Sequence, residues 1–443
     1  MSNQSALNYI NFIFLYFALD NCILNMKANV HLFAKHPGID FTRDRKLGFV
    51  NLMRFIIAMK GKTLRKEIRK YFKKSKNIMS NSAFVQQRTK LNDKTFPYLL
   101  EIFNKTSADY DTRLYKGYKL LAVDGSDFNI AKNINSESYI NGEGNIMHLN
   151  AICDILNNVF LKTYIEPKSK CDERKACLSM LSDMTFNEKT ILIADRGYES
   201  YQFFATVGSI HNLDYLVCVK NSGTKIAKNL PMKELDIETT IELRITQTNE
   251  DKEAYRSGKA IWIAGPSKFG KDKKLVTWTL PSPYHLTLRV VRFEIAPGSY
   301  ETIITSLNRC EFPIKTIKKM YHRRWQIETA FRWLKYALST IHFHGKSEEF
   351  SIQEILARII MYNFSMRIMM NTEIKDTSNC KHLYQINYTE GFDLSRDYWH
   401  SRGSPPWNTM KLLQETILPI RPDRKDIRKL KKKTFIPFIY RVA

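Results

Sequence analysis

The sequence predicts an α/β protein in which helices flank a buried mixed sheet. Two apolar runs, YKLLAVDG and KTILIADRG, each end in an acid that is closely followed by glycine. Such runs are typical of central strands that open into a loop at the edge of a sheet. Amphipathic helical segments precede the first run, and short strand-like segments with Gly, Pro and Lys breaks follow the second. These observations together define the fold class.

Residues 1–110 are predicted to be helical. The segments DRKLGFVNLMRFIIAM and TLRKEIRKYFKK place apolar residues at steps of three and four, which indicates amphipathic helices. The region fits either a helix-turn-helix or a plain helical bundle, since no decisive turn signature separates the two. The apolar stretch SALNYINFIFLYFAL contains two asparagines and meets Asp20 before it reaches spanning length, so we expect a buried helix there.

The charge balance points to a polyanionic partner. The chain has 69 Lys and Arg against 44 Asp and Glu, which gives a formal net charge of +25. This excess costs self-repulsion in the compact state, and nucleic acid is the partner that would offset it. The basic residues are spread through the whole chain, which favours nucleic acid over a membrane surface. The scattered, odd-numbered cysteines predict reduced thiols and a cytoplasmic protein.

Changes of pattern divide the chain into five parts. They are a helical N-terminal DNA-binding region (1–110), the first part of the sheet core (111–220), a β-rich insertion (221–310), the second part of the core (311–371) and a basic C-terminal region (372–443). Within the second part of the core, a long helix is expected to start at Pro313 and to continue to about Leu338.

Asp124 and Asp195 are the first candidates for a functional site. Each is predicted to end a buried strand, and the carboxyl edge of an open sheet is where such folds carry their active sites. Either acid alone would more often be a helix cap or a turn residue. The pair, followed by a third acid on a basic helix, favours a site. Asp127 is predicted to be a turn or loop acid, because only Asp124 ends the strand.

The segment YHRRWQIETAFRWLK, residues 321–335, is a basic helix with one acid. At about 100° per residue, Tyr321, Arg324, Glu328 and Lys335 fall within about 60° of one another and form a single stripe. A solvated charged face would more often alternate in sign to allow pairing along the helix. The stripe therefore predicts that Glu328 acts beside cations that bind phosphate.

Three clustered carboxylates need a counter-charge. Each pair among Asp124, Asp195 and Glu328 would repel by about 4 kcal/mol at about 4 Å and an effective dielectric near 20. Oxygen ligands without Cys or His favour Mg2+ or Mn2+. Two such ions about 4 Å apart activate a water or a 3′-hydroxyl and stabilise the leaving oxygen of a phosphodiester. The neighbouring cations, including Arg323 and Arg332, would then hold the phosphates.

These motifs resemble those of a known family. VDGS, ADRGY and the spacing Tyr321-x2-Arg324-x3-Glu328-x6-Lys335 are similar to the DDE transposases of the insertion-sequence-four family, whose helix signature is Y-(2)-R-(3)-E-(6)-K. The resemblance extends from FTRDRKLGF near the N-terminus to FIYR at the basic end. It implies an RNase H-like core with a β-rich insertion between the second and third acids.

The resemblance also implies roles for single residues. The three acids would be the catalytic, metal-binding triad, and the other three residues of the signature would bind phosphates at the element terminus and at a hairpin end. An insertion-domain tryptophan would receive a flipped base, and Trp262 and Trp278 are both candidates. For each of them a buried position in a β-core is the alternative.

The implied activity is cut-and-paste transposition. A homodimer would hold two terminal inverted repeats and target DNA, and would act through nicking, hairpin formation, hairpin opening and strand transfer. The protein would be bacterial and cytoplasmic, associated with the nucleoid when bound to double-stranded DNA, and would have no membrane partner.

Two other functions stay open on the sequence alone. One is a related metal-dependent nuclease or resolvase that cuts DNA without joining it. The other is a catalytically silent DNA-binding repressor of the element, against which the intact set of acids argues.

Overall fold

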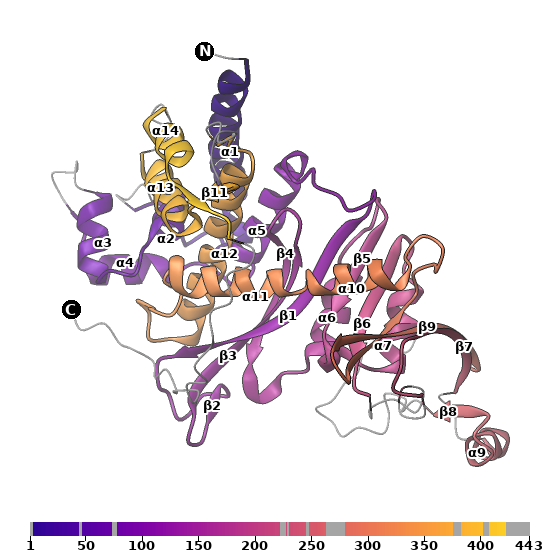
Figure 1. Ribbon diagram of the computed structural model, residues 1–443. Coiled ribbons are helices and arrows are strands. Elements are labelled where there is room, and N and C mark those ends of the chain that lie inside the picture. Colours follow the sequence, from indigo (N-terminus) through magenta and orange to yellow (C-terminus); the bar gives the residue numbers. More distant parts are fainter. Residues whose placement is uncertain are drawn as a thin grey trace.

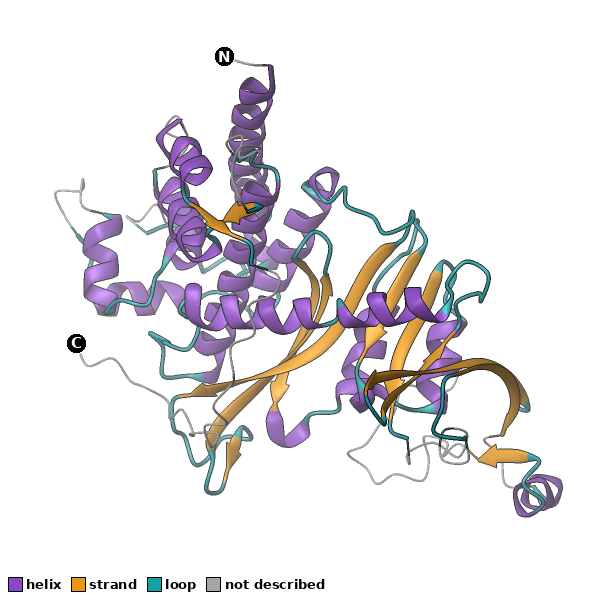
Figure 2. Cartoon of the chain, viewed as in Figure 1, coloured by secondary structure: helices purple, strands orange, loops and turns teal. Residues whose placement is uncertain are grey.

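The chain forms a broad twisted sheet with helices on both faces. The computed structural model describes residues 3–43, 47–72, 78–221, 227, 230–244, 248–262, 280–374, 382–401 and 407–421. Helices from both termini gather at one end of the sheet, and strands β9, β7 and β8, whose bounds are given below, extend the other end (Figures 1 and 2). This large mixed sheet with flanking helices confirms the α/β fold class.

The elements have the following bounds. The strands are β1 (Lys119–Ile130), β2 (Tyr139–Ile140), β3 (Gly144–Asp154), β4 (Val159–Pro167), β5 (Thr190–Ala194), β6 (Leu213–Val219), β7 (Leu235–Arg244), β8 (Ala260–Trp262), β9 (Tyr284–Ala296), β10 (Ser299–Thr305), β11 (Tyr384–Ile386) and β12 (Ile417–Pro419). The helices are α1 (Asn3–Ala28), α2 (Phe49–Ala58), α3 (Leu64–Tyr71), α4 (Asn81–Arg88), α5 (Thr95–Thr106), α6 (Glu173–Ser182), α7 (Tyr201–Gly208), α9 (Asn249–Arg256), α10 (Ile314–His322), α11 (Trp325–Arg332), α12 (Glu348–Met370), α13 (Tyr388–His400) and α14 (Trp407–Glu415).

Parallel strands form the centre of the sheet. The order in the described chain is β2-β3-β1-β5-β6-β10-β9-β7-β8, and β4 also pairs with β3. Strand β5 pairs in parallel with both β1 and β6, whereas β3 pairs with β1 in the antiparallel sense. Parallel neighbours need crossover connections. Helix α6 precedes β5 and helix α7 precedes β6, so each parallel strand is reached through a helix.

Both faces of the central strands are buried. On β1, Leu120 and Ala122 belong to one hydrophobic cluster, whereas Leu121 and Val123 belong to a second one. Successive side chains of a strand point to opposite faces, so the two clusters lie on opposite sides of the sheet. Helices α6 and α7 contribute to the second cluster, and the helices of both termini contribute to the first. This double burial explains the uninterrupted apolar runs of the sequence.

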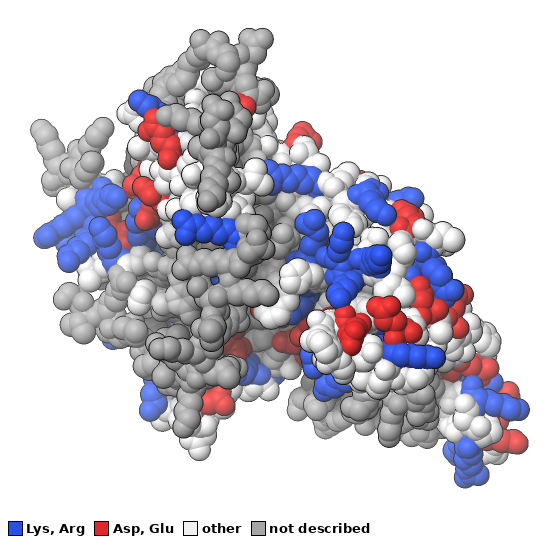
Figure 3. Space-filling view, in the orientation of Figure 1, with Lys and Arg blue, Asp and Glu red and all other residues white. Residues whose placement is uncertain are grey.

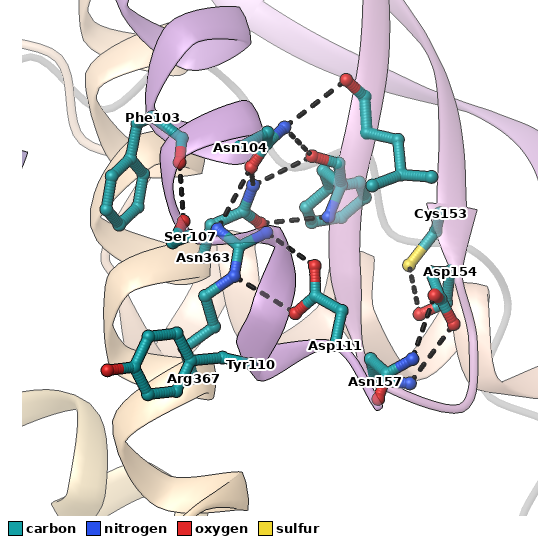
Figure 4. Close-up of polar contacts among 12 residues, drawn as sticks. Phe103, Asn104, Ser107, Tyr110, Asp111, Cys153, Asp154, Asn157, Asn363 and Arg367 are labelled. Carbon is teal, nitrogen blue, oxygen red and sulfur yellow. Dashed lines mark hydrogen bonds and ion pairs between the residues drawn. The ribbon is translucent and has the colours of Figure 1, made fainter. Parts of the chain in front are cut away.

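Helix α12 is the centre of the helical layer. Its residues are buried almost without interruption from Ser351 to Met369, and it packs against α1, α2, α5 and α13. A buried polar network ties it to α5: Arg367 donates to both carboxylate oxygens of Asp111 at 3.0 and 2.6 Å, and Asn363 donates to Asn104 at 2.9 Å (Figure 4). The N-terminal helices therefore share a core with the helix that follows the basic segment.

Helix α1 is the one described helix long and apolar enough to cross a membrane. The span that passes this test is Tyr9–Ala28, and half of it is buried inside the protein. Leu15, Leu19 and Ile23 are fully buried in the cluster that includes α12. The apolar stretch near the N-terminus therefore packs on other helices along one of its sides, as the sequence predicts.

The strands of residues 221–310 continue the central sheet. Strands β9 and β10 form a hairpin, and β10 pairs with β6 of the parallel centre. The sequence pattern predicts these strands but contains no information on which strand they pair with. The division of the chain into domains stays a prediction.

The long helix expected from Pro313 to about Leu338 is wrong as a single α-helix. Pro313 does precede α10, but α10 and α11 are joined by tight turns, and a π-helical turn, Trp333–Ala337, follows α11. The N–H of Arg324 bonds to the carbonyl of Tyr321, three residues back, in the pattern of a 3₁₀ turn. A tighter turn changes the rotation per residue, so the 100° projection holds only approximately here.

Candidate active site

Asp124 lies where the parallel part of β1 ends. Parallel pairing with β5 stops at Ala122, whereas antiparallel pairing with β3 continues to Ile130. The prediction that the strand itself ends at Asp124 is therefore wrong, because β3 is long enough to extend β1 by six residues beyond it. Asp124 still lies at the carboxyl edge of the parallel sheet, where active sites of such folds are found.

The carboxyl group of Asp124 is costly to ionise in the free protein. Desolvation by burial raises its pKa to about 6, and the negative charges of Asp195 and Glu328 act in the same direction. The Gly125 amide, which donates to Oδ1 at 2.8 Å, and the Arg324 guanidinium oppose the rise. The electrostatic coupling to both other acids means that Asp195 and Glu328 lie near this carboxylate.

Asp195 follows β5, the direct neighbour of β1. It caps the 3₁₀ turn Arg196–Tyr198, and its Oδ1 accepts a hydrogen bond from the Gly197 amide at 2.8 Å. Because β1 and β5 are adjacent and parallel, Asp124 and Asp195 share one edge of the sheet. The sequence-based placement of both acids at this edge is borne out by the geometry, while their catalytic role is not tested by it.

Glu328 comes to this edge from α11 and meets Asp124 through Arg324. The Arg324 guanidinium bonds to Glu328 Oε1 at 2.8 Å and contacts Asp124 Oδ2 at 3.5 Å. Arg324 is only 9% exposed, and its Nε finds no hydrogen-bond partner among the described residues. An arginine thus supplies the positive charge between two of the three acids, instead of standing free to meet a phosphate.

The acids are neighbours but do not form a ready-made metal site. Within the described part of the chain, no three His, Cys, Asp or Glu side chains are close enough to hold a metal ion as they stand. The donor chemistry nevertheless fits a hard divalent cation, because all three groups are carboxylates and a cationic side chain already lies between two of them. The buried Oη of Tyr198 lacks a hydrogen-bond partner in the described chain, and Tyr198 is close enough to Glu173, Asp124 and Asp195 for their charges to act on it.

Tyr321 and Lys335 are both largely buried. Desolvation raises the pKa of Tyr321, whose ring lies beside Cys218. Burial lowers the pKa of Lys335, and its ammonium group lies 5.0 Å from the centre of the Phe128 ring. Phe128 is on β1 beyond Asp124. The stripe predicted from the sequence therefore faces the sheet along much of its length.

The other predicted DNA-binding residues differ in exposure. Arg332 is exposed on α11, and Arg323 is half-buried with its guanidinium over the Tyr115 ring at 5.6 Å. Trp262 is the last residue of β8. Trp278 lies outside the described residues, so the choice between the two tryptophans stays open.

The sequence prediction missed a charged group beside the acids. Asp127 is a strand residue, not a turn acid: it lies on β1 opposite His148 of β3, and His148 Nδ1 contacts Asp127 Oδ1 at 2.7 Å. Asp127 also binds Lys168 at 2.7 Å, and His148 contacts Glu173 at 3.4 Å. The one sequence feature that could have indicated this group is CDERK, in which Asp172 caps α6 and Glu173 is its first residue.

Comparison with known proteins identifies the family. Residues 115–364 match the model described as a transposase DDE domain, and this range covers more than half of the chain. The chain belongs to this family. The matched range includes Asp124, Asp195 and Glu328. The transposase is thus an enzyme of DNA transposition and recombination, of the DDE type whose members generally use divalent metal ions.

The transposase was also compared with solved structures and with curated protein sequences. The chain is similar to a protein in a cryo-EM structure of a piggyBac transposase synaptic complex with hairpin DNA, with 12% sequence identity and a TM-score of 0.44. That similarity covers 95% of this chain and 87% of the other. No curated protein sequence matches the transposase.

Proposed function

We propose that this transposase moves an insertion sequence by a cut-and-paste reaction: strand nicking, hairpin formation and opening, and strand transfer. The observation that carries the proposal is the match to the DDE domain over residues 115–364. Within this range Arg324 forms ion pairs with both Asp124 and Glu328, next to the loop of Asp195. Metal-dependent cleavage of a phosphodiester uses acids to hold the ions and cations to hold the phosphates.

The core is proposed to be RNase H-like and of the insertion-sequence-four type. The strand order β4-β3-β1-β5-β6, with β1, β5 and β6 parallel and β3 antiparallel, supports an RNase H-like core. The Y-R-E-K spacing supports the narrower family assignment. The helical region 1–110 would bind DNA, and residues 221–310 would be the insertion.

Asp124, Asp195 and Glu328 are proposed to hold two Mg2+ or Mn2+ ions. When bound, such ions supply a counter-charge for the carboxylates and Lewis acidity for the phosphodiester. The chain itself supplies the positions: adjacent parallel strands carry two acids, and α11 brings the third. Arg324 offsets part of the negative charge of two of these acids in the free protein, and it would turn to a DNA phosphate as the acids take up cations.

The cations around the acids are proposed to bind the DNA backbone. Lys335 and Tyr321 line the sheet side of the helical segment, and Arg323 and Arg332 lie on its more accessible side. Lys and Arg also gather over α3 and α10 in the view of Figure 3. Binding through such contacts falls steeply with salt.

The biological setting follows from this activity. The active form would be a homodimer that holds both terminal inverted repeats together with target DNA, in the bacterial cytoplasm and on the nucleoid. Trp262 or Trp278 would receive a flipped base at the hairpin stage.

The test uses purified full-length protein, the DNA that flanks its own gene, and a target plasmid, with Mg2+ or Mn2+. We expect nicks at the element ends, hairpin-ended intermediates and joined products. Cleavage without joined product would show a nuclease or resolvase instead. Specific binding without any cleavage in either metal would show a repressor.

A further inference from the structure

A fourth carboxylate, that of Glu173, lies between the β1 backbone that follows Asp124 and the loop that follows Asp195. Glu173 is the first residue of α6, and its side chain is 37% exposed. A Cβ atom added to Gly125 would lie 2.9 Å from Oε1 of Glu173, and one added to Gly197 would lie 3.2 Å from Oε2. One oxygen of this carboxylate thus lies close to the residue after Asp124, and the other lies close to the loop after Asp195.

A row of side chains with charges of alternating sign extends from this carboxylate to Lys168. Lys168 binds Asp127 at 2.7 Å, Asp127 binds His148 at 2.7 Å, and the other ring nitrogen of His148 lies 3.4 Å from Glu173 Oε1. His148 is 8% exposed. Despite desolvation, the hydrogen bond to Asp127 leads the contributions that raise the pKa of His148 to about 11, so the ring is a cation at neutral pH. The row Lys168–Asp127–His148–Glu173 therefore carries charges of alternating sign.

The imidazole of His148 packs closely on the β1 backbone at Gly125. A Cβ atom on Gly125 would lie only 2.2 Å from Nε2 of His148, so this glycine allows the ring to pack directly on the backbone next to Asp124. On the other side, a Cβ atom on Gly197 would also lie 3.0 Å from Oδ1 of Asp195. The Glu173 carboxylate therefore lies next to the backbone that follows Asp124 and next to the backbone that follows Asp195.

We propose that Glu173 is a positioning residue that fixes the Asp124 strand and the Asp195 loop at the separation that metal binding requires. His148, itself held by Asp127, keeps the Glu173 carboxylate in this position. The inference rests on the proposed function and goes beyond its set of three acids. A carboxylate that only stabilises the start of α6 would interact with the helix amides and would not need His148.

The test compares Glu173→Gln with the wild-type full-length protein. The readouts are Mn2+ affinity in the absence of DNA, measured by electron paramagnetic resonance, cleavage of an element-end substrate, and Tm without metal. We expect Mn2+ affinity and cleavage to fall by about tenfold to hundredfold, the usual cost of losing a residue that orients metal ligands, with Tm nearly unchanged. Glu137→Gln is the matched control, because Glu137 pairs with Lys170 at 2.7 Å on an exposed surface.

A double-mutant cycle separates positioning from helix stabilisation. If His148 acts through Glu173, His148→Gln lowers Mn2+ affinity, and the double variant loses no more than Glu173→Gln alone. Additive losses would overturn the proposal, as would wild-type Mn2+ affinity in Glu173→Gln. If Glu173→Gln fails to fold, His148→Gln decides alone, since it keeps the carboxylate and removes its partner. Failure of the wild type to bind Mn2+ or to cut would instead contradict the proposed function.

Discussion

At the residue scale, the guanidinium of Arg324 has two roles, one in the free protein and one in the proposed complex with DNA. In the free protein it binds Glu328 and contacts Asp124, which offsets the repulsion between two acids that approach each other without a metal ion. In the proposed reaction it binds a phosphate. On the proposed function, a metal ion and Arg324 would compete for the same carboxylates, so that Arg324 would weaken metal binding in the absence of DNA.

Removal of this competitor gives the first prediction. Arg324→Ala should bind Mn2+ several-fold more tightly than the wild type without DNA, because the carboxylates lose their internal counter-charge. Its cleavage of element ends should nevertheless fall at least tenfold, because one phosphate contact is lost. Calorimetric titration measures the first effect and an oligonucleotide assay the second. Arg332→Ala, an exposed change on the same helix, should leave Mn2+ affinity unchanged; weaker Mn2+ binding by Arg324→Ala would refute the competition.

At the element scale, a buried ion pair ties α12 to the segment that follows α5. Arg367 and Asp111 are 1% and 5% exposed in their side chains, and the same arginine bonds to Asn104 of α5 at 3.1 Å. Loss of one partner leaves a buried charge uncompensated. Arg367→Met should therefore reduce the free energy of unfolding by about 3–5 kcal/mol in urea titrations. The exposed pair of Lys162 and Glu101 offers the control, since Lys162→Met should cost less than about 1 kcal/mol.

The packing of α13 gives a pH-dependent prediction. Burial lowers the pKa of His400 to about 4, and Lys70 acts in the same direction. The unfolded chain binds a proton at a pH where the folded chain does not, so His400 costs stability as pH falls from about 6.5 through 4. The loss amounts to up to about 3 kcal/mol. His400→Phe should remove this component of the pH dependence of unfolding, whereas a change at exposed His285 should not. Parallel pH curves for wild type and His400→Phe would contradict it.

At the scale of the whole molecule, the helices of residues 1–110 are part of the main core. Helices α1, α2 and α5 contact α12, which also packs on β4. Deletion of residues 1–110 would expose the fully buried face of α12, so the remaining chain should aggregate or lose its cooperative thermal transition. Circular dichroism and size-exclusion chromatography measure this. A monodisperse truncated protein with a sharp melting transition would show instead that the N-terminal helices form a separable unit.

Local sequence patterns predicted the helices and strands, whereas strand lengths and strand partners depend on pairing between distant segments. The two apolar runs predicted the strands of Asp124 and Asp195, because burial on both faces leaves a direct trace in sequence. The continuation of β1 to Ile130 depends on β3, and the join between β10 and β6 depends on residues far apart in the chain. The place of Glu173 depends on three segments at once. Pairing of this kind leaves no local periodicity.

The proposed function requires that the three acids act together in metal-dependent DNA cleavage. The most direct measurement is the Mg2+-dependent cleavage rate of an element-end substrate by Asp124→Asn, Asp195→Asn and Glu328→Gln, each checked for unchanged DNA binding. We expect each variant to bind DNA like the wild type and to cut at least about a thousandfold more slowly, since the loss of any ligand removes the same transition-state stabilisation. Cleavage at the wild-type rate by any one of the three variants would contradict it.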